Sequence, residues 1–349
     1  MGKPESNAKG IKGFFTHLIT LIWWHLPIKR EDRKRIKDFV FTRFRPLFCR
    51  TKMYRNWKEA DMLSGITFNE HDVDYPAHWP PVGHGKIRQP SPVAVDTSSI
   101  DALAIILHVY HVEILHEILR HLAKPSNQKV KLFVTYPPEK AEEINGVLSN
   151  SQADHQLLAY ENRGRDVLPF LKTCAVAFEQ GYGLILKLHT KKSDHRMAGS
   201  IWRKEIFNAL LPVKARNEIV EIFNGNPSVG ILGPAGHIVP MSLYYGANAK
   251  GIGYLCHRLG VDTRELHGMA FVAGSMFYAR KEAILPLLEL GMPDAVFEPE
   301  AGQLDGTMAH AYERGFAISS YAAGLWIVDN RFDPRNPQPA ITANHRFTW

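Results

Sequence analysis

The stretch Ala102-Leu103-Ala104-Ile105-Ile106-Leu107 indicates the fold class of this chain. Six apolar residues in a row, without alternation, predict a strand that is buried on both faces. Residues 112–119 follow closely with apolar side chains at helical spacing, which predicts an amphipathic helix. A buried strand followed by a helix is the first half of a βαβ unit. The stretch therefore predicts an α/β protein with a mainly parallel sheet.

The same alternation continues along the chain. Further strands are predicted at residues 131–135, 155–160, 183–188, 228–233 and 269–278, and helices at 139–149, 167–179, 281–290 and 308–314. Crossovers between parallel strands are right-handed, and their helices flank the sheet. We therefore expect one α/β domain over residues 99–328, between a wrapping or linker segment (61–98) and an irregular C-terminal tail (329–349).

Basic residues are concentrated at the N-terminus. Residues 1–60 hold fifteen Lys and Arg against five Asp and Glu, so they carry +10, and the rest of the chain carries −3 of the total of +7. Apolar clusters at 14–28 and 39–48 alternate with these bases. Such a segment is typical of an amphipathic helical arm that lies on an anionic membrane. A solvated basic extension and a helix packed on the domain are the alternatives.

Several classes of protein are disfavoured by the same residues. The run 14–28 is shorter than the ~20 residues that span a bilayer, and no small-residue cleavage site follows it. No RNA-binding motif accompanies the bases, so no nucleic-acid partner is expected. Cys49, Cys174 and Cys256 are odd in number and widely spaced, which argues against a disulfide framework or a zinc site and fits a reducing compartment.

Ligands of open α/β sheets bind beyond the carboxyl ends of the strands, so residues that follow predicted strands are candidate site residues. The first such group is Asn162-Arg163-Gly164-Arg165-Asp166, ahead of the helix predicted at 167–179. Gly164 permits a tight turn, Asp166 can cap the helix, and the two arginines offer forked donors to phosphate. A capped turn with a surface ion pair is the alternative.

The second group ends the strand predicted at 183–188 and reads Lys187-Leu188-His189-Thr190-Lys191-Lys192-Ser193. Its cations and hydroxyls could neutralise a diphosphate by point charges, where many enzymes use a divalent metal. The alternative is that the two neighbouring lysines are solvated surface residues.

The third group follows the apolar strand predicted at 269–278, which contains Gly274 and Ser275. Three carboxylates (Glu298, Glu300 and Asp305) crowd a turn before the helix predicted at 308–314. A carboxylate near a helix N-terminus is stabilised as the anion and can serve as a general base. An N-capping cluster is the alternative.

Five blocks, in order, carry a resemblance to a known family. They are Asn-Arg-Gly-Arg-Asp (162–166), Leu-His-Thr-Lys-Lys-Ser (188–193), Gly-Pro-Ala-Gly-His (233–237), Ala-Gly-Ser-Met-Phe (273–277) and Gln-Leu-Asp-Gly-Thr (303–307). Together they resemble the rhamnan synthesis protein F family over about residues 100–325. Their order is also similar to that of GT-A glycosyltransferases, in which a later acidic turn holds the catalytic base.

The resemblance implies a GT-A-like α/β glycosyltransferase with the basic amphipathic arm as an N-terminal addition. It would move rhamnose, or a similar sugar such as galactofuranose, from a dTDP- or UDP-linked donor to a lipid-linked or oligosaccharide acceptor of a surface polysaccharide, with inversion. Asp305 matches the position of the catalytic base, and Glu300 is next in line. The expected location is the cytoplasm, peripheral on the inner face of the cytoplasmic membrane.

The donor-binding residues that the resemblance implies come from all three groups: Asn162, Arg163, Gly164, Arg165, Asp166, His189, Thr190, Lys191, Lys192, Ser275 and Gln303. His189, Lys191 and Lys192 stand where the GT-A families have their metal-binding aspartates. For this reason no metal ligands are assigned, and a divalent metal is not expected although it stays open. The nucleotide sugar is the expected cosubstrate.

Two other functions stay open. A non-catalytic glycan-binding or assembly protein with a degenerate glycosyltransferase fold is favoured by the missing Asp-x-Asp pair, and is opposed by the retained basic strand end and acidic turn. A phosphotransferase for surface polymers would also use a basic pocket. The lack of a Walker-type glycine loop argues against a nucleoside-triphosphate version of it.

Overall fold

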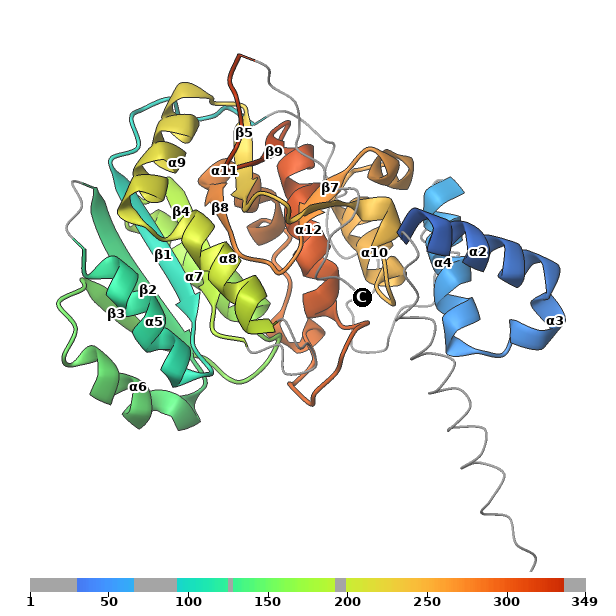
Figure 1. The fold of residues 1–349 in the computed structure, drawn as a ribbon, viewed down its shortest axis with the longest axis horizontal. Coiled ribbons are helices and arrows are strands. Elements are labelled where there is room, and N and C mark those ends of the chain that lie inside the picture. Colours follow the sequence, from blue (N-terminus) through green and yellow to red (C-terminus); the bar gives the residue numbers. More distant parts are fainter. Residues whose placement is uncertain (1–29, 66–92, 125–127, 192–198, 336–349) are drawn as a thin grey trace, which may run out of the picture.

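The structure is a computed structural model that describes residues 30–65, 93–124, 128–191 and 199–335 (Figure 1). The apolar run at 14–28, most of the linker, Lys192 and the end of the tail lie outside the described residues. No helix among the described residues is both long and apolar enough to cross a membrane.

After three N-terminal helices, helices and strands alternate along most of the described chain. The helices are α2 (Arg30–Arg43), α3 (Arg45–Phe48), α4 (Lys52–Gly65), α5 (Val112–Leu122), α6 (Ala141–Leu148), α7 (Val167–Glu179), α8 (Gly199–Leu210), α9 (Val213–Gly225), α10 (Ala249–Leu259), α11 (Lys281–Leu288) and α12 (Met308–Ala322). The strands are β1 (Ala102–His108), β2 (Lys129–Tyr136), β3 (His155–Ala159), β4 (Leu184–His189), β5 (Val229–Gly233), β6 (Ile238–Pro240), β7 (Ala270–Val272), β8 (Phe277–Arg280) and β9 (Trp326–Asp329).

A seven-stranded sheet forms the centre of the fold, in the order β3-β2-β1-β4-β8-β5-β9. Its pairs are parallel except where β8 lies antiparallel to both β4 and β5. The chain runs outward from β1 to β3 and then returns to place β4 on the other side of β1. The strand order therefore reverses between β1 and β4, which is the topological switch point where open α/β sheets bind ligands.

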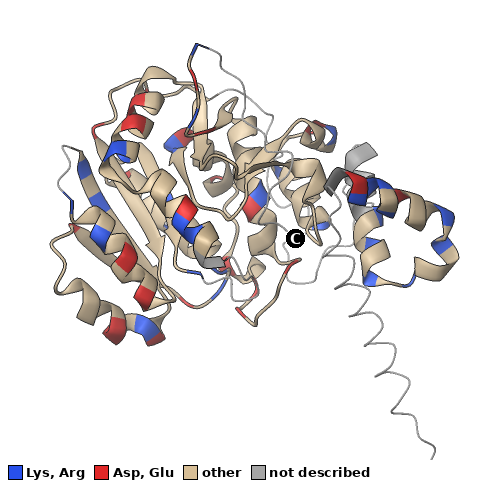
Figure 2. Ribbon diagram, viewed as in Figure 1, with Lys and Arg blue, Asp and Glu red and all other residues tan. Residues whose placement is uncertain are grey.

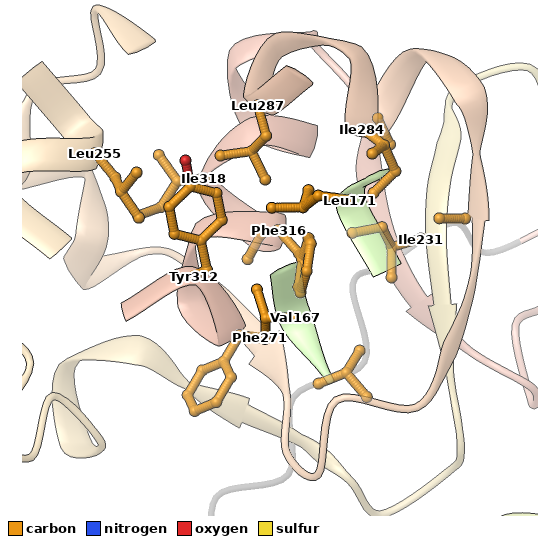
Figure 3. Close-up of a cluster of buried hydrophobic side chains, with 14 of the residues drawn as sticks. Val167, Leu171, Ile231, Leu255, Phe271, Ile284, Leu287, Tyr312, Phe316 and Ile318 are labelled. Atoms are coloured by element: carbon orange, nitrogen blue, oxygen red, sulfur yellow. The ribbon is translucent and has the colours of Figure 1, made fainter. Parts of the chain in front are cut away.

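Helices cover both faces of the sheet (Figure 1). Side chains of α5, α6, α8 and α9 pack on one face, together with residues such as Leu103 and Leu184. The other face is covered by α7, α11 and α12, whose Leu171, Leu287 and Phe316 lie in a second apolar cluster (Figure 3). The sequence-based expectation of an α/β fold with a mainly parallel sheet between helices is thus confirmed.

One prediction was wrong, because a segment that was expected to form a single strand forms two. Residues 269–278 were expected to form one strand, but they form β7 and β8, separated by a turn. Gly274 and Ser275 in that turn have φ angles of +88° and +55°, which a strand does not allow. The first half pairs with β6 in a separate two-stranded sheet, and the second half enters the main sheet. The sequence showed a continuous apolar run because both halves are buried.

The helices α2 to α4 form a lobe beside the main domain (Figure 1). In this lobe α4 contacts α10 and the short helix η4 (Thr263–His267), so the described part of the basic arm is joined to the domain. Residues 93–96 also lie on the domain, because the Val93 amide donates to the Ala323 carbonyl and the Asp96 amide donates to Glu282.

Candidate functional site

The carboxyl ends of β1 and β4 place polar side chains at the switch point. His108 is paired in register with His189 on one side and with Thr135 of β2 on the other. The Nδ1 atom of His108 lies 3.0 Å from the Thr135 hydroxyl. A row of Thr135, His108 and His189 therefore crosses three neighbouring strands at the edge where ligands of such sheets bind.

The loop 162–166 has a backbone that its sequence specifies. Gly164 has φ of +64°, and a Cβ there would lie 2.7 Å from that of Leu168, so only glycine fits. Arg165 also has a positive φ, of 57°, although it is not glycine. Strain of this kind is concentrated at functional sites. The turn ends where α7 begins, with the Val167 amide donating to the Gly164 carbonyl at 3.0 Å.

Asp166 occupies the N-cap position of α7 but its side chain makes no capping bond. Its carboxylate instead accepts a short hydrogen bond from the ammonium of Lys187, and both side chains are buried. The surface ion pair considered for this turn is therefore a buried one. Although burial opposes ionisation, Lys187 holds the pKa of the Asp166 carboxyl well below its usual range.

Lys187 connects the second group to the third. Besides Asp166, its ammonium donates to the Ser275 carbonyl at 3.0 Å. The rings of Phe170 and Phe316 lie 5.3 and 5.9 Å from the same nitrogen, which adds cation–π attraction where water is excluded. Lys187 thus holds the turn between β7 and β8 against the loop before α7.

Burial opposes protonation of the His189 and His108 rings. The Nε2 atom of His189 lies 3.0 Å from the Gly274 carbonyl, and its Nδ1 accepts from the Lys191 amide at 3.2 Å. Burial lowers the pKa of His108 to about 4 and also lowers that of His189, while Asp166 opposes both shifts. Both ring nitrogens of His189 are used within the protein.

Thr190 and Lys191 end the strand differently. The Thr190 hydroxyl is buried and accepts from the Tyr110 and His111 amides, each at 2.9 Å, so it joins the end of β4 to the start of α5. Lys191 is exposed. Of the two lysines expected to contact donor phosphates, it is the one that the structure describes, and it lies beyond the carboxyl end of β4.

The turn at Gly274 and Ser275 is packed tightly against α8. A Cβ at Gly274 would lie 2.3 Å from the ring of Trp202. The Ser275 hydroxyl and the Trp202 indole nitrogen are both buried without a hydrogen-bond partner. Buried polar atoms of this kind are unusual and tend to mark functional regions.

The loop 162–166 is paired with the acidic turn. The Gly164 amide donates to the Glu298 carbonyl at 3.0 Å, and the Glu300 amide donates to the Asn162 carbonyl at 3.1 Å. The guanidinium of Arg163 donates to the Phe297 carbonyl at 2.7 Å. Stretches about 135 residues apart in the sequence are therefore joined by backbone hydrogen bonds.

Arg165 is paired with the acidic turn through its side chain. Its Nε donates to Glu300 at 3.0 Å, and its Nη1 lies 2.5 Å from Nε2 of His310 in α12. Burial lowers the pKa of His310, and the neighbouring positive Arg165 acts in the same direction. The second Glu300 oxygen accepts from the Gly302 amide at 2.9 Å. Both oxygens of Glu300 are thus engaged.

Asp305 lies in the exposed part of the same turn, and its partners come from another segment. One oxygen accepts from the Ala247 amide at 2.9 Å, and the other accepts from the Asn248 side-chain amide at 2.6 Å. The side-chain oxygen of Asn248 in turn accepts a hydrogen bond from the Gly306 amide at 3.0 Å, so the side chain of Asn248 is bonded to the turn through both its nitrogen and its oxygen. Asp305 is held by neutral donors, whereas Glu300 is held by a guanidinium.

The N-terminus of α12 is capped by other residues of this turn. Thr307 is the N-cap and accepts from the His310 amide, and a Glu298 oxygen accepts from the Met308 amide at 2.9 Å. The capping role considered for the acidic turn therefore belongs to Glu298 and Thr307. Gln303 folds back on the turn, where it donates to the Pro299 carbonyl and accepts from the Ala301 amide.

The three groups expected from the sequence meet at the carboxyl ends of the strands. Three further polar residues of this region, His108, Thr135 and Asn248, were not identified from the sequence. The first two end strands that were predicted, and the rule that drew attention to residues 187–193 applies to them equally. Asn248 carries no such signal, because it lies fifteen residues beyond the end of the strand predicted at 228–233. Among the described residues, no cluster of three or more His, Cys, Asp or Glu could hold a metal ion.

These features define an α/β protein with a mainly parallel sheet, whose candidate ligand site lies at the topological switch point and combines a buried ion pair with an acidic turn. The chain belongs to the rhamnan synthesis protein F family, whose family model matches residues 64–324. The name of the family connects the chain to polysaccharide synthesis.

Two curated relatives come from Xanthomonas campestris pv. campestris, both described as "Uncharacterized protein WxcX". They are 34% and 33% identical to this chain over 268 residues, which is 76% of this chain and 37% of each relative. The chain therefore spans little more than a third of the length of the curated relatives it matches.

Proposed function

We propose that this chain is a glycosyltransferase that moves a sugar from a nucleoside diphosphate donor to a hydroxyl of a surface-polysaccharide glycan. The observation that carries the proposal is the convergence of residues 162–166, 187–191 and 298–305 at one strand-end edge, beside the switch point. The exposed base Lys191 and the carboxylate-rich turn 298–305 both belong to this region. Sugar transfer needs both, and the family name indicates rhamnan synthesis.

The proposed reaction is a single displacement with inversion. The acceptor oxygen bonds to the anomeric carbon of the sugar as the bond from that carbon to the diphosphate oxygen breaks. The acceptor proton goes to a carboxylate of the turn, and the nucleoside diphosphate leaves with one additional negative charge. Lys191 and Lys192 would stabilise that charge, as preorganised cations do for departing phosphates.

Asp305 is the base in this proposal, in preference to Glu300. A carboxylate that is partly buried and already paired with a guanidinium is less accessible to an incoming hydroxyl. Glu300 has Arg165 as such a partner at 3.0 Å. Asp305 has two neutral donors and an exposed position, which supports proton transfer from an acceptor that arrives from solvent.

Sugar donor, acceptor linkage and metal requirement are also proposals. We infer a dTDP- or UDP-linked donor and an acceptor on a lipid-linked or free oligosaccharide. We also infer that lysines, rather than a divalent metal, neutralise the diphosphate. The exposed base Lys191, two residues beyond the end of β4, supports this choice.

One observation favours a second function, that of a non-catalytic glycan-binding or assembly protein. The carboxylates of Glu298, Glu300 and Asp305 all accept hydrogen bonds within the protein, so each of them contributes to holding the turn. A protein that had lost the donor chemistry would keep such contacts. It would bind oligosaccharide without releasing nucleotide.

The two functions are separated by one assay on the purified chain. A panel of nucleotide sugars is incubated with and without an oligosaccharide acceptor, in EDTA and again with Mn²⁺, and released nucleoside diphosphate is measured. We expect release from one donor, accelerated by acceptor and retained in EDTA. Release that depends on Mn²⁺ would contradict the metal inference alone. Acceptor binding without release from any donor would contradict the transferase.

A further inference from the structure

The lobe of α2 to α4 has its own small aromatic core. Phe41 is 3% exposed, and its ring centroid lies 5.4 to 5.6 Å from those of Phe48, Tyr54 and Trp57. The indole nitrogen of Trp57 also donates to Asp38 at 2.7 Å, which fastens α4 to α2. The lobe is therefore a packed unit that can present a defined surface.

One side of the lobe is fixed to the main domain and the other is not. The contacts of α4 with α10 and η4, and of α2 with η3 (Met241–Leu243), cover the domain side. The corner that contains α3 lies at the far end of the lobe, away from the sheet (Figure 1). We call residues 43–53, which form this corner, the tip.

The tip exposes large apolar side chains that the aromatic core does not use. Leu47 is 76% exposed, and Phe44 and Met53 are each 46% exposed. Phe39, in the preceding turns of α2, is 65% exposed. Exposed apolar residues are ordinary when scattered, but their gathering around one corner indicates an interaction surface.

The charge of the tip has a single sign. Residues 43–53 contain four basic residues (Arg43, Arg45, Arg50 and Lys52) and no acidic residue. Figure 2 shows the bases along the lobe, with the acidic residues of the lobe away from its α3 end. The partner of the tip must therefore offer both apolar contact and negative charge.

We propose that the tip inserts into the surface of an anionic lipid bilayer. Phe44 and Leu47 would enter the boundary between head groups and acyl chains, and the flanking bases would pair with lipid phosphates. A bilayer supplies both kinds of contact over a broad area, whereas an acidic protein surface supplies chiefly charge. The apolar run at 14–28, which is followed by Lys29 and Arg30 and precedes the lobe in the sequence, fits the same partner.

Cys49 provides a probe in the natural protein. It is the exposed cysteine of the tip, whereas Cys174 and Cys256 are buried. A polarity-sensitive fluorophore on Cys49 of the full chain is titrated with vesicles of phosphatidylcholine alone or with phosphatidylglycerol added. We expect a blue shift, and quenching by spin-labelled lipid, only with the anionic vesicles.

Two variants test the contribution of the tip, and one serves as a control. Each base near an anionic surface contributes about fivefold in affinity, so Arg43→Glu with Arg45→Glu should weaken vesicle binding by more than about tenfold. Leu47→Ser should weaken it by about tenfold through lost apolar burial. Lys214→Glu in α9, where the side chain is 88% exposed, reverses a charge elsewhere and should have little effect.

Three outcomes would overturn the proposal. Absence of binding to anionic vesicles is the first. Co-sedimentation without any change at the Cys49 fluorophore is the second, because another segment would then make the contact. A spectral response to polyglutamate but not to vesicles is the third, and it would assign the tip to an acidic protein. None of these outcomes depends on whether the chain transfers sugar.

Discussion

The Asp166 carboxylate and the Lys187 ammonium form a buried ion pair that joins the loop before α7 to β4, with side-chain exposures of 8% and 1%. The same ammonium holds the Ser275 carbonyl, so one cation fixes two of the turns that form the candidate site. Residues 166, 187 and 275 come from different parts of the sequence. Their contact is what allows separate strand-end groups to act as one site.

Removing one partner of this pair should destabilise the protein strongly. Lys187→Met leaves the Asp166 carboxylate buried without a cation, and we expect about 3–5 kcal/mol less stability in urea denaturation. Adding Asp166→Asn should restore most of the loss, because no buried charge remains. Lys172→Met, which breaks the exposed pair with Asp294, should cost less than about 1 kcal/mol. Equal losses for the two lysines would contradict the burial argument.

His108 should make stability fall in mild acid. Its pKa is about 4 in the folded protein, chiefly through burial, against an ordinary value of 6.5. Below pH 6.5 the unfolded chain takes up a proton that the folded protein refuses, so stability is lost as the pH falls from 6.5 to about 4. The difference is on the order of 3 kcal/mol.

Urea denaturation at several pH values measures this effect. His108→Gln keeps a polar partner for Thr135 but cannot titrate, so its stability should depend less steeply on pH over the same window. His189 acts in the same direction and remains in the variant, so some slope should persist. An unchanged slope in His108→Gln would show that His108 is protonated equally in both states.

Gly274 should tolerate no side chain. Its φ of +88° costs an alanine about 1–2 kcal/mol, and the Cβ would also meet the Trp202 ring at 2.3 Å. Gly236 is a matched control, since its φ is +82° and no atom lies within 4 Å of the position that a Cβ would take. Thermal denaturation should therefore rank Gly274→Ala well below Gly236→Ala. If the two variants lost the same amount of thermal stability, the contact with Trp202 would not contribute to the cost at Gly274.

The sequence predicted the elements of the sheet better than their junctions. Strand-like apolar runs located β1, β2, β4 and β5, because buried parallel strands are apolar on both faces. The break at Gly274 was missed, since the residues on both sides of it are apolar and buried. The strand-end rule located Lys191 and Asp166, but the partner of Asp166 depends on strand order, which periodicity does not reveal. For the same reason the contact between Asp305 and Asn248 could not be predicted.

Lys191 and Lys192 should be needed for nucleotide binding. Each charge-assisted contact to a phosphate contributes about 1.5–3 kcal/mol, so Lys191→Ala with Lys192→Ala should weaken nucleoside diphosphate binding at least tenfold in calorimetry. Lys214→Ala, on α9, removes a charge away from this edge and should bind as the wild type does. If the double variant also binds normally, the diphosphate is held elsewhere.

Turnover by Asp305→Asn, compared with its donor affinity, tests the central claim most directly. The substitution removes basicity and replaces one of the two oxygens that accept from Ala247 and Asn248 by an NH2 group. Donor affinity should therefore stay close to that of the wild type, while the unfolding midpoint falls slightly through the lost hydrogen bond. Removing a general base lowers the rate by about 10²–10⁴-fold, and we expect sugar transfer to fall by that factor. Glu300→Gln should retain more activity, because Glu300 is already paired with Arg165. Transfer at the wild-type rate by Asp305→Asn would contradict the account.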